Sequence, residues 1–174
     1  MYRYTPTKRY KRTLEFVEQH LTGSSVILDL GVPNPLALKL KNLGHEVHNT
    51  GGEDLDTDFS AVQKPTYEVV TAFEILEHLV SPYPILKAIH AQKLIASIPL
   101  KLWFAPAYRS KTDPRDRHYH EFESWQFDWL LEKAGWRILA REKWTHPGPF
   151  KLGIRPLLRW FTPRYYIVYA ERIS

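Results

Sequence analysis

Acidic residues that directly follow two apolar runs are the side chains most able to do chemistry in this chain. Asp29 lies near the end of the run 26–30 and is followed by Gly31, while Phe73 and Glu74 follow the run 67–72. Buried parallel strands read as such runs and place ligand sites at their carboxyl ends. A carboxylate there accepts hydrogen bonds from an ammonium or hydroxyl group, and glycine lets the backbone approach a ligand closely. The pattern predicts a nucleotide-like cofactor lying across an open sheet.

Three histidines are candidate general bases: His78, His118 and His120. A positioned imidazole can remove a proton from a reacting group. A single histidine is more often structural or solvated, so that alternative stays open for each of them. His118 and His120 could also be metal ligands, but the sequence shows no clear third ligand, and we predict no metal site.

The elements that must position these residues alternate between strands and helices. Strands are expected at 26–30, 46–50, 67–72, 93–98, 136–140 and 165–171, and the acidic segment 53–58 is either a loop or a short further strand. Helices are expected at 8–22, 36–43, 85–90 and 122–134. This alternation implies a mostly parallel sheet with helices on both faces. Because no good helix separates the last two strands, one of them is expected to run antiparallel.

The chain is expected to form a single domain over residues 1–174. Its parts are the N-terminal helix 8–22, a ligand-binding core over 24–98, a long loop over 99–121, and a helix and strands over 122–174. The expected fold class is α/β: a three-layer Rossmann-like sandwich with a mostly parallel seven-stranded sheet and an antiparallel last strand. Trp125, Trp129, Trp136 and Trp144 are expected in the core, since their spacing is helical or strand-like.

Composition and charge narrow the class of protein. The chain has no cysteine, which excludes disulfides, thiolate nucleophiles and Cys-ligated zinc. No apolar run approaches the roughly 18 residues that span a bilayer, and we expect a cytoplasmic protein of open oligomeric state. The net charge is +5, with basic ends at 1–12 and 143–172. These ends could attract nucleic acid or lipid headgroups, although solvation of the surface is the more common explanation.

Several motifs, in their order along residues 24–140, are similar to those of the class I S-adenosylmethionine-dependent methyltransferases. The matching segments are Val-Ile-Leu-Asp-Leu-Gly at 26–31, Gly-His-Glu-Val at 44–47, Tyr-Glu-Val-Val-Thr-Ala-Phe-Glu-Ile-Leu-Glu-His-Leu at 67–79, Leu-Ile-Ala-Ser-Ile-Pro at 94–99, His-Glu-Phe at 120–122, and Leu-Leu-Glu-Lys-Ala-Gly-Trp at 130–136. The Glu-His-Leu and Leu-Leu-Glu-Lys-Ala-Gly-aromatic segments are the more specific. That family has a seven-stranded sheet whose seventh strand is antiparallel.

The resemblance implies a role for individual residues in holding the cofactor. Asp29, Leu30 and Gly31 match the motif that holds the methionine part and the adjoining ribose. Phe73 and Glu74 match the strand end that lines the sulfonium, and His78 matches the helix-start histidine. The remaining implied cofactor contacts are Asp56, which matches the acid that hydrogen-bonds the adenine amine, its neighbours Asp58 and Phe59, and Gly51 at the end of the second strand.

The chain departs from the family pattern at two places. Where the family continues with Gly-x-Gly, this chain has Pro33 and Pro35, which lack an N–H and fix φ. The acid that grips the ribose falls at Gly51, so Glu53 or Asp54 would have to reach in. We expect methyl transfer from S-adenosylmethionine, giving S-adenosylhomocysteine, to a small or medium-sized acceptor at O, N or C. The alternatives are a cofactor-binding pseudoenzyme and a basic nucleic-acid-binding protein.

The long loop at 99–121 is expected to cover the acceptor. Its aromatic residues Trp103, Phe104 and Tyr108 are candidates for a lid. Its basic residues, which would favour an anionic acceptor unless they are simply solvated, are Arg109, Lys111, Arg115 and Arg117. The apolar and basic segment 154–161 could lie on a membrane surface or over a lipid-like substrate, although packing against the sheet is the expectation for so short a piece.

Overall fold

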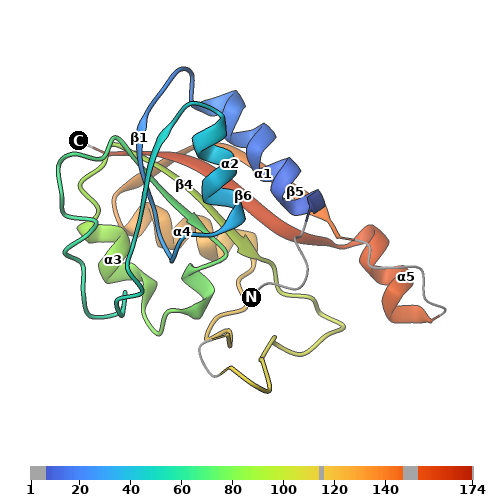
Figure 1. The fold of residues 1–174 in the computed structure, drawn as a ribbon. Coiled ribbons are helices and arrows are strands. Elements are labelled where there is room, and N and C mark those ends of the chain that lie inside the picture. Colours follow the sequence, from blue (N-terminus) through green and yellow to red (C-terminus); the bar gives the residue numbers. More distant parts are fainter. Residues whose placement is uncertain (1–6, 114–115, 147–152, 174) are drawn as a thin grey trace.

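The structure is a computed structural model that describes residues 7–113, 116–146 and 153–173 (Figure 1). Its centre is a six-stranded sheet with the strand order β2-β1-β3-β4-β6-β5. The strands are β1 (Val26–Asp29), β2 (Glu46–Asn49), β3 (Val69–Phe73), β4 (Lys93–Pro99), β5 (Trp136–Thr145) and β6 (Pro163–Arg172). β2, β1, β3 and β4 pair in parallel, and β6 pairs antiparallel with both β4 and β5. The expected antiparallel last strand is confirmed.

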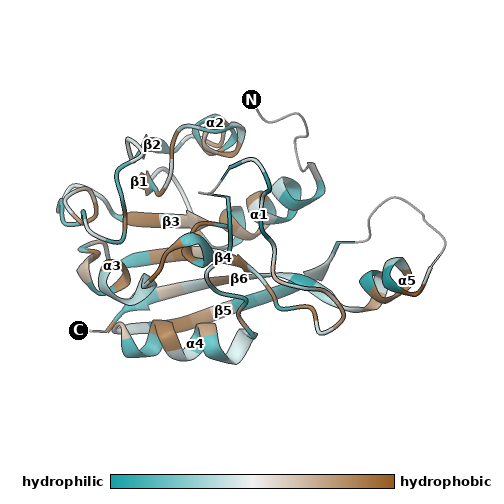
Figure 2. Cartoon of the chain, turned by 90° about the horizontal axis from the view of Figure 1, so that it is seen from below, coloured by the Kyte–Doolittle hydropathy of each residue, from teal (hydrophilic) through white to brown (hydrophobic). Residues whose placement is uncertain are grey.

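Helices cover both faces of this sheet, as the alternation predicts (Figure 1). α1 (Thr7–His20) and α2 (Pro35–Asn42) lie on one face, where Phe16, Val17 and Leu40 pack against Ile27 and Ile95. On the other face, α3 (Pro82–Ala88) and α4 (Ser124–Lys133) pack on a separate cluster of buried apolar residues. The central strands β3 and β4 are apolar along most of their length, as Figure 2 shows. The fold is thus a three-layer α/β sandwich.

The prediction of a seventh strand is wrong, because the acidic segment 53–58 forms turns. The N–H groups of Thr57 and Asp58 donate to the carbonyl of Asp54, at 3.0 and 2.8 Å. A further turn bond runs from the Asp56 N–H to the Asp54 side chain at 3.0 Å. These local bonds use the backbone donors that a strand would need for its neighbour. The sheet of the described residues therefore ends at β2.

The expectation for the tryptophans is correct at two positions and wrong at two. Trp136 and Trp144 are buried, but Trp125 and Trp129 are 58% and 56% exposed. α4 instead buries Phe127 and Leu131, four residues apart on the face toward the sheet. Two residues of offset along a helix turn a side chain to a different face, so the tryptophan stripe points away from the core.

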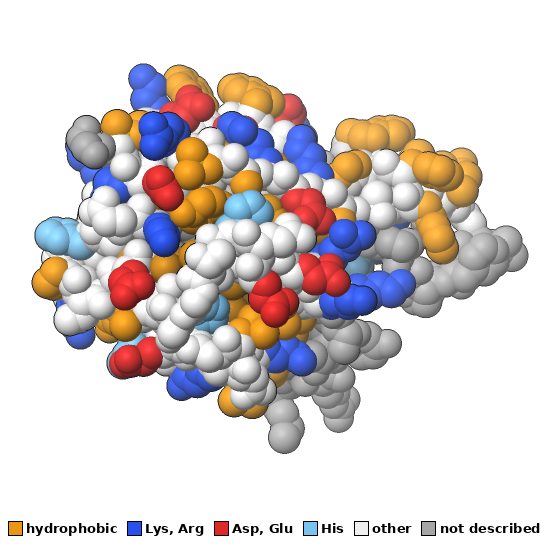
Figure 3. Space-filling view, turned by 90° about the horizontal axis from the view of Figure 1, so that it is seen from above, with side chains coloured by type: hydrophobic (Ala, Val, Ile, Leu, Met, Phe, Trp, Pro, Cys, Tyr) orange, Lys and Arg blue, Asp and Glu red, His pale blue; other side chains and the backbone are white. Residues whose placement is uncertain are grey.

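The segment 154–161 forms a helix, α5 (Ile154–Phe161), that protrudes from the body of the molecule (Figure 1). It contacts β5 and β6 but buries none of its residues, so the expected packing against the sheet does not occur. Its apolar residues Ile154 and Phe161 are 76% and 78% exposed, and hydrophobic side chains gather over α5 at the right of Figure 3. Within the described ranges, every helix is too short or too polar to cross a bilayer.

Candidate active site

Asp29 occupies the carboxyl end of β1, between the ends of β2 and β3. It pairs in register with Asn49 on one side and Thr71 on the other. The Thr71 hydroxyl donates to Asp29 Oδ1 at 2.7 Å, and the Asn49 amide donates to Oδ2 at 3.1 Å. Asp29 is 2% exposed, and this burial raises the pKa of its carboxyl to about 6. The predicted cofactor residue thus lies at the crevice that an open parallel sheet offers to ligands.

Several backbone N–H groups in the turn from β1 to α2 are hydrogen-bonded to side chains of the protein. The Gly31 N–H donates to the Thr50 hydroxyl at 2.6 Å, with Gly31 at a φ of 108° that suits glycine. Asn34 Oδ1 accepts from the N–H groups of Leu36 and Ala37, at 2.9 and 3.1 Å. This cap at the start of α2 uses amides that a helix N-terminus would otherwise present to a ligand.

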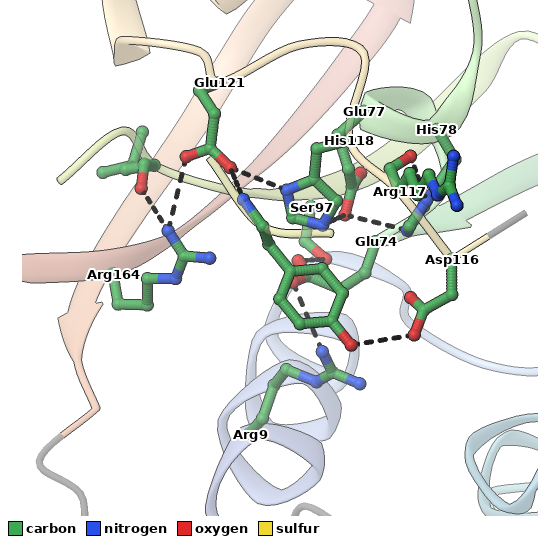
Figure 4. Close-up of polar contacts among 12 residues, drawn as sticks. Arg9, Glu74, Glu77, His78, Ser97, Asp116, Arg117, His118, Glu121 and Arg164 are labelled. Atoms are coloured by element: carbon green, nitrogen blue, oxygen red, sulfur yellow. Dashed lines mark hydrogen bonds and ion pairs between the residues drawn. The ribbon is translucent and has the colours of Figure 1, made fainter. Parts of the chain in front are cut away.

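Glu74, directly after β3, is the second carboxylate of the crevice. Among the described residues it is the one non-glycine residue with a positive φ, 55°. Its Oε1 accepts from the Ser97 hydroxyl at 2.9 Å, and its Oε2 lies 3.3 Å from Arg9 Nη1 (Figure 4). Burial raises the pKa of Glu74, although the charge of Arg9 opposes that effect. The sequence indicated Arg9 only as part of a basic N-terminus.

Arg9 narrows the crevice to a small cavity of about 100 Å³. The cavity lies between the carboxyl edge of the sheet and α1, and its lining residues include Arg9, Asp29, Leu30, Phe73, Glu74 and Ser97. Four of these six were predicted as cofactor contacts. The guanidinium also lies 5.6 Å from the ring of Tyr165. Arg9 therefore contacts Tyr165 as well as Glu74, and Tyr165 borders a larger space.

That larger space is a cavity of about 650 Å³ between the loop 99–121, α5 and the start of β6. Phe104, Tyr108 and Arg109, predicted for the acceptor side, line it, whereas Trp103 is 74% exposed and lies outside the lining. Its other cationic or ionisable lining residues are His146, Arg155, Arg159 and Arg164. Arg155 and Arg159 belong to the segment 154–161, for which a place over a lipid-like substrate was one alternative, whereas sequence reasoning assigned no substrate role to His146 or Arg164, 25 or more residues beyond the loop. Arg115 falls outside the described residues.

Two of the three predicted histidines lie together, and the third lies apart. The rings of His78 and His118 are 4.9 Å apart, centre to centre, next to the buried Glu77 (Figure 4). His118 Nδ1 lies 2.9 Å from Glu121 Oε1. His120 instead stacks on Phe122, and its Nε2 lies 3.1 Å from the Val80 carbonyl.

The residues predicted for the adenine side are engaged within the protein. Asp56 accepts from the N–H groups of Val80 and Ser81, at 2.9 and 2.8 Å, through both carboxylate oxygens. Asp58 accepts from the Ser60 N–H at 2.9 Å, while Phe59 packs against the core. The Gly51 N–H donates to Glu53 Oε2 at 2.6 Å. Their contact with an adenosine group stays a prediction.

Comparison with known proteins gives the fold a family context. By sequence, the chain matches no protein-family model and no curated protein. By structure, it is similar to a SAM-dependent methyltransferase from Archaeoglobus fulgidus, with a TM-score of 0.66 and 14% identity over 98% of this chain and 96% of that one. It is also similar to the 1,6-didemethyltoxoflavin-N1-methyltransferase of Burkholderia thailandensis, whose structure holds S-adenosylhomocysteine, with a TM-score of 0.62 and 15% identity over 95% and 78%.

A third similar structure is phosphoethanolamine N-methyltransferase 2 of Haemonchus contortus in complex with S-adenosyl-L-methionine, with a TM-score of 0.62 and 10% identity over 94% of this chain and 53% of that one. Likeness at such low identity establishes the fold. The chain has the Rossmann-like fold of the class I S-adenosylmethionine-dependent methyltransferases.

Proposed function

We propose that the chain binds S-adenosylmethionine in the crevice between Asp29 and Glu74 and transfers its methyl group to a small or medium-sized anionic acceptor in the arginine-lined cavity. The observation that carries the proposal is the position of two carboxylates, Asp29 buried and Glu74 partly buried, at the carboxyl ends of the adjacent strands β1 and β3. In the shared fold, ligands bind at this edge. S-adenosylmethionine supplies a methyl group on a positively charged sulfur.

The charges of the crevice fit the methionine end of that cofactor. Asp29 and Glu74 both line the small cavity, and among its described lining residues Arg9 is the one cation. An ammonium or sulfonium group could replace the Arg9 guanidinium beside Glu74 without leaving the carboxylate unpaired. A volume of about 100 Å³ is well below the roughly 300 Å³ of small-molecule sites, so binding requires Arg9 to move.

The larger cavity has the size and charge for the acceptor. Its volume of about 650 Å³ accommodates a small or medium-sized molecule. Arg109, Arg155, Arg159 and Arg164 provide donors that suit a carboxylate or phosphate, while Leu102 and Phe104 provide apolar surface. Because Arg9 contacts both Glu74 in the crevice and Tyr165 in this cavity, we infer that its displacement would connect the two. The proposed reaction then depends on holding acceptor and methyl group in line.

His118 is the better-placed candidate for a general base. A carboxylate only accepts, so the hydrogen bond to Glu121 fixes the neutral His118 ring with its proton on Nδ1. Nε2 is then able to take a proton from an acceptor. His120 Nε2 faces the Val80 carbonyl, so it donates there and is occupied.

Calorimetry with S-adenosylmethionine and S-adenosylhomocysteine tests the cofactor site. We expect the wild type to bind both, and Arg9→Ala to bind S-adenosylmethionine about tenfold more tightly, because Glu74 would lose a competing cation. Lys8→Ala is the matched control, since Lys8 is exposed on the same helix. No binding of either compound at millimolar concentration, by wild type or by Arg9→Ala, would contradict the proposal.

The acceptor site has its own test. With labelled S-adenosylmethionine, transfer to a panel of carboxylates and phosphates should exceed transfer to their neutral esters. The double variant Arg155→Ala/Arg159→Ala should raise the acceptor KM at least about tenfold and leave cofactor affinity unchanged. A variant with an unchanged KM would exclude this cavity as the acceptor site.

Backbone amides in and after the β1–α2 turn are already hydrogen-bonded within the protein. This favours one second candidate, a cofactor-binding protein without transfer activity. The Gly31 amide and the first amides of α2 are bonded to Thr50 and Asn34. If the chain binds S-adenosylmethionine but transfers no label to any anion of the panel, this candidate replaces the enzyme.

A further inference from the structure

Glu77, His78 and His118 form a compact cluster of metal-ligating side chains. Glu77 and His78 belong to the short 3-10 helix η1 (Leu76–His78) after β3, and His118 comes from the long loop. One possible ligand atom from each residue lies within 4.8 Å of the other two. Glu77 Oε1 is 3.8 Å from His78 Nε2 and 4.0 Å from His118 Nε2 (Figure 4).

These separations fit a metal site better than a hydrogen-bond network. Both are longer than the roughly 2.7–3.2 Å of a hydrogen bond between nitrogen and oxygen. Two ligands at about 2.05 Å from a tetrahedral ion lie about 3.4 Å apart, so the two separations from Glu77 would each shorten by about half an ångström around a shared ion.

Hydrogen bonds at Nδ1 set the tautomer of each ring. His78 Nδ1 lies 3.0 Å from the carbonyl oxygen of Arg117, and His118 Nδ1 lies 2.9 Å from Glu121 Oε1. Both partners are acceptors, so each Nδ1 carries a proton and each neutral ring has its lone pair on Nε2. Metal-ligating histidines have this arrangement, with the other nitrogen held by a carbonyl or carboxylate.

The Glu77 carboxylate provides an independent reason to expect a ligand. Glu77 is 1% exposed, and within the described chain its Oε2 has no hydrogen-bond partner. A buried oxygen without a partner costs about 1–3 kcal/mol or more. Oε1 is the oxygen that faces the imidazoles, and a cation bound by this carboxylate would neutralise its charge and so lower the cost of burying it.

The backbone holds the cluster in place from both sides. The N–H groups of Tyr119 and His120 both donate to the carbonyl of Glu77, at 2.8 and 3.2 Å. These bonds fix the residues after His118 to the 3-10 helix that carries the other two ligands. Glu121 is held in turn by the Tyr108 N–H at 3.0 Å and by Arg164 Nη1 at 3.7 Å.

We propose that Glu77, His78 and His118 bind a divalent transition-metal ion through one carboxylate oxygen and two imidazole Nε2 atoms, with Zn²⁺ as the best-fitting ion. Two nitrogens and one oxygen suit Zn²⁺, whereas Mg²⁺ and Ca²⁺ prefer sites of oxygen alone. Three protein ligands leave one position of a tetrahedral ion open. Glu121 is a positioning residue, since it acts through His118.

Metal binding at this cluster does not require the proposed methyl transfer, but a bound ion would change the chemistry of that transfer. Tyr108 and Arg164, which contact His118 and Glu121, also line the larger cavity. An ion there would take the Nε2 lone pair that a general base needs, so His118 would no longer act as a base. An acceptor hydroxyl bound to the ion would instead lose its proton more readily.

Metal titration of the full chain, free of any histidine tag and stripped with a chelator, tests the site. We expect one equivalent of Zn²⁺ by calorimetry, and one equivalent of Co²⁺ with the visible absorption of a low-symmetry site. Glu77→Gln and His118→Asn should each weaken Zn²⁺ binding by more than about tenfold, and Glu121→Gln by about 10- to 100-fold. His120→Asn is the matched control, because His120 lies outside the cluster, and its affinity should equal that of the wild type.

Several results would overturn the metal site. Wild type without a stoichiometric ion would do so, and so would a Glu77→Gln or His118→Asn variant that binds as tightly as His120→Asn. If both cluster variants fail to fold, anomalous diffraction at the zinc edge from wild-type crystals tests the site instead. A peak elsewhere, or no peak, would overturn the proposal. The titrations contain no S-adenosylmethionine, so their failure is distinct from failure of the proposed function.

Discussion

Glu74 combines backbone strain with a buried charge. A non-glycine residue in the left-handed region costs on the order of 1–3 kcal/mol, and at a φ of 55° Glu74 bears such a cost. Its side chain is held by Ser97 and Arg9, so its carboxylate cannot leave the crevice without losing both partners. Strain of this kind clusters at functional sites, and here it coincides with the position proposed for the sulfonium.

Asp29 gives a pH-dependent prediction at the same scale. Burial raises the pKa of Asp29 from 3.8 to about 6, so the folded chain holds this proton more tightly than the unfolded chain. The stabilisation is therefore complete below about pH 4 and is lost as the pH rises to about 6. A shift of about two units corresponds to roughly 3 kcal/mol. Asp29→Asn, which has no charge to bury, should be more stable than wild type at pH 7 by up to about this amount.

Urea unfolding of wild type and Asp29→Asn between pH 4 and pH 7 measures this effect. The difference in free energy of unfolding should grow across that range and level off above about pH 6. Asp58→Asn is the control, since Asp58 is an exposed carboxylate. A difference that is independent of pH would show that Asp29 does not titrate in this window.

At the scale of single elements, α2 depends on its cap. Asn34 accepts from two amides of the first turn, and Pro35 at the first helical position needs no partner for its nitrogen. Asn34→Ala should lower the free energy of unfolding by about 1 kcal/mol, measured by urea unfolding. Asn34→Ser keeps an acceptor oxygen without adding a charge beside Asp29, and should lose far less. Equal losses in the two variants would mean that the cap contributes nothing.

The sequence predicts an element well when the residues that decide its structure lie within the element itself. The runs at 26–30, 46–50 and 93–98 became β1, β2 and β4 within one or two residues, because a buried strand is a local apolar pattern. The segment 53–58 lacked such a pattern, and its turn bonds decided against a strand. Trp125 and Trp129 share a helical face, but only the packing of α4 determines which face is buried.

The site was less predictable than the elements, since it depends on contacts across the whole molecule. Asp29 and Glu74 could be predicted as candidates from sequence because Asp29 ends its strand and Glu74 directly follows β3. Arg9 reaches Glu74 from 65 residues away, and His118 reaches Glu77 from about 40 residues away. No periodicity within one segment reports such a contact. The contact between His118 and Glu77 could have been suggested from sequence by looking for a histidine in a loop that can meet an acid placed just after a strand.

At the scale of the whole molecule, the protrusion of α5 predicts uneven stability. α5 buries no residue, whereas α4, which is of similar length, buries Phe127 and Leu131. Local opening is easiest where few apolar contacts are lost. Amide hydrogen exchange should therefore show protection in α5 at least about tenfold lower than in α4. Equal protection in the two helices would indicate that α5 is covered by something in solution.

The long loop leaves and rejoins the body of the protein at one point. Leu100 and Phe122 form a parallel bridge, and the Lys101 N–H donates to the Phe122 carbonyl at 2.8 Å. Because its two ends are fastened together, the stretch between them can change length and composition without disturbing the order of the strands. In evolutionary terms, changes in this stretch could alter the loop side of the acceptor cavity while the strand order and the α5 side stay as they are.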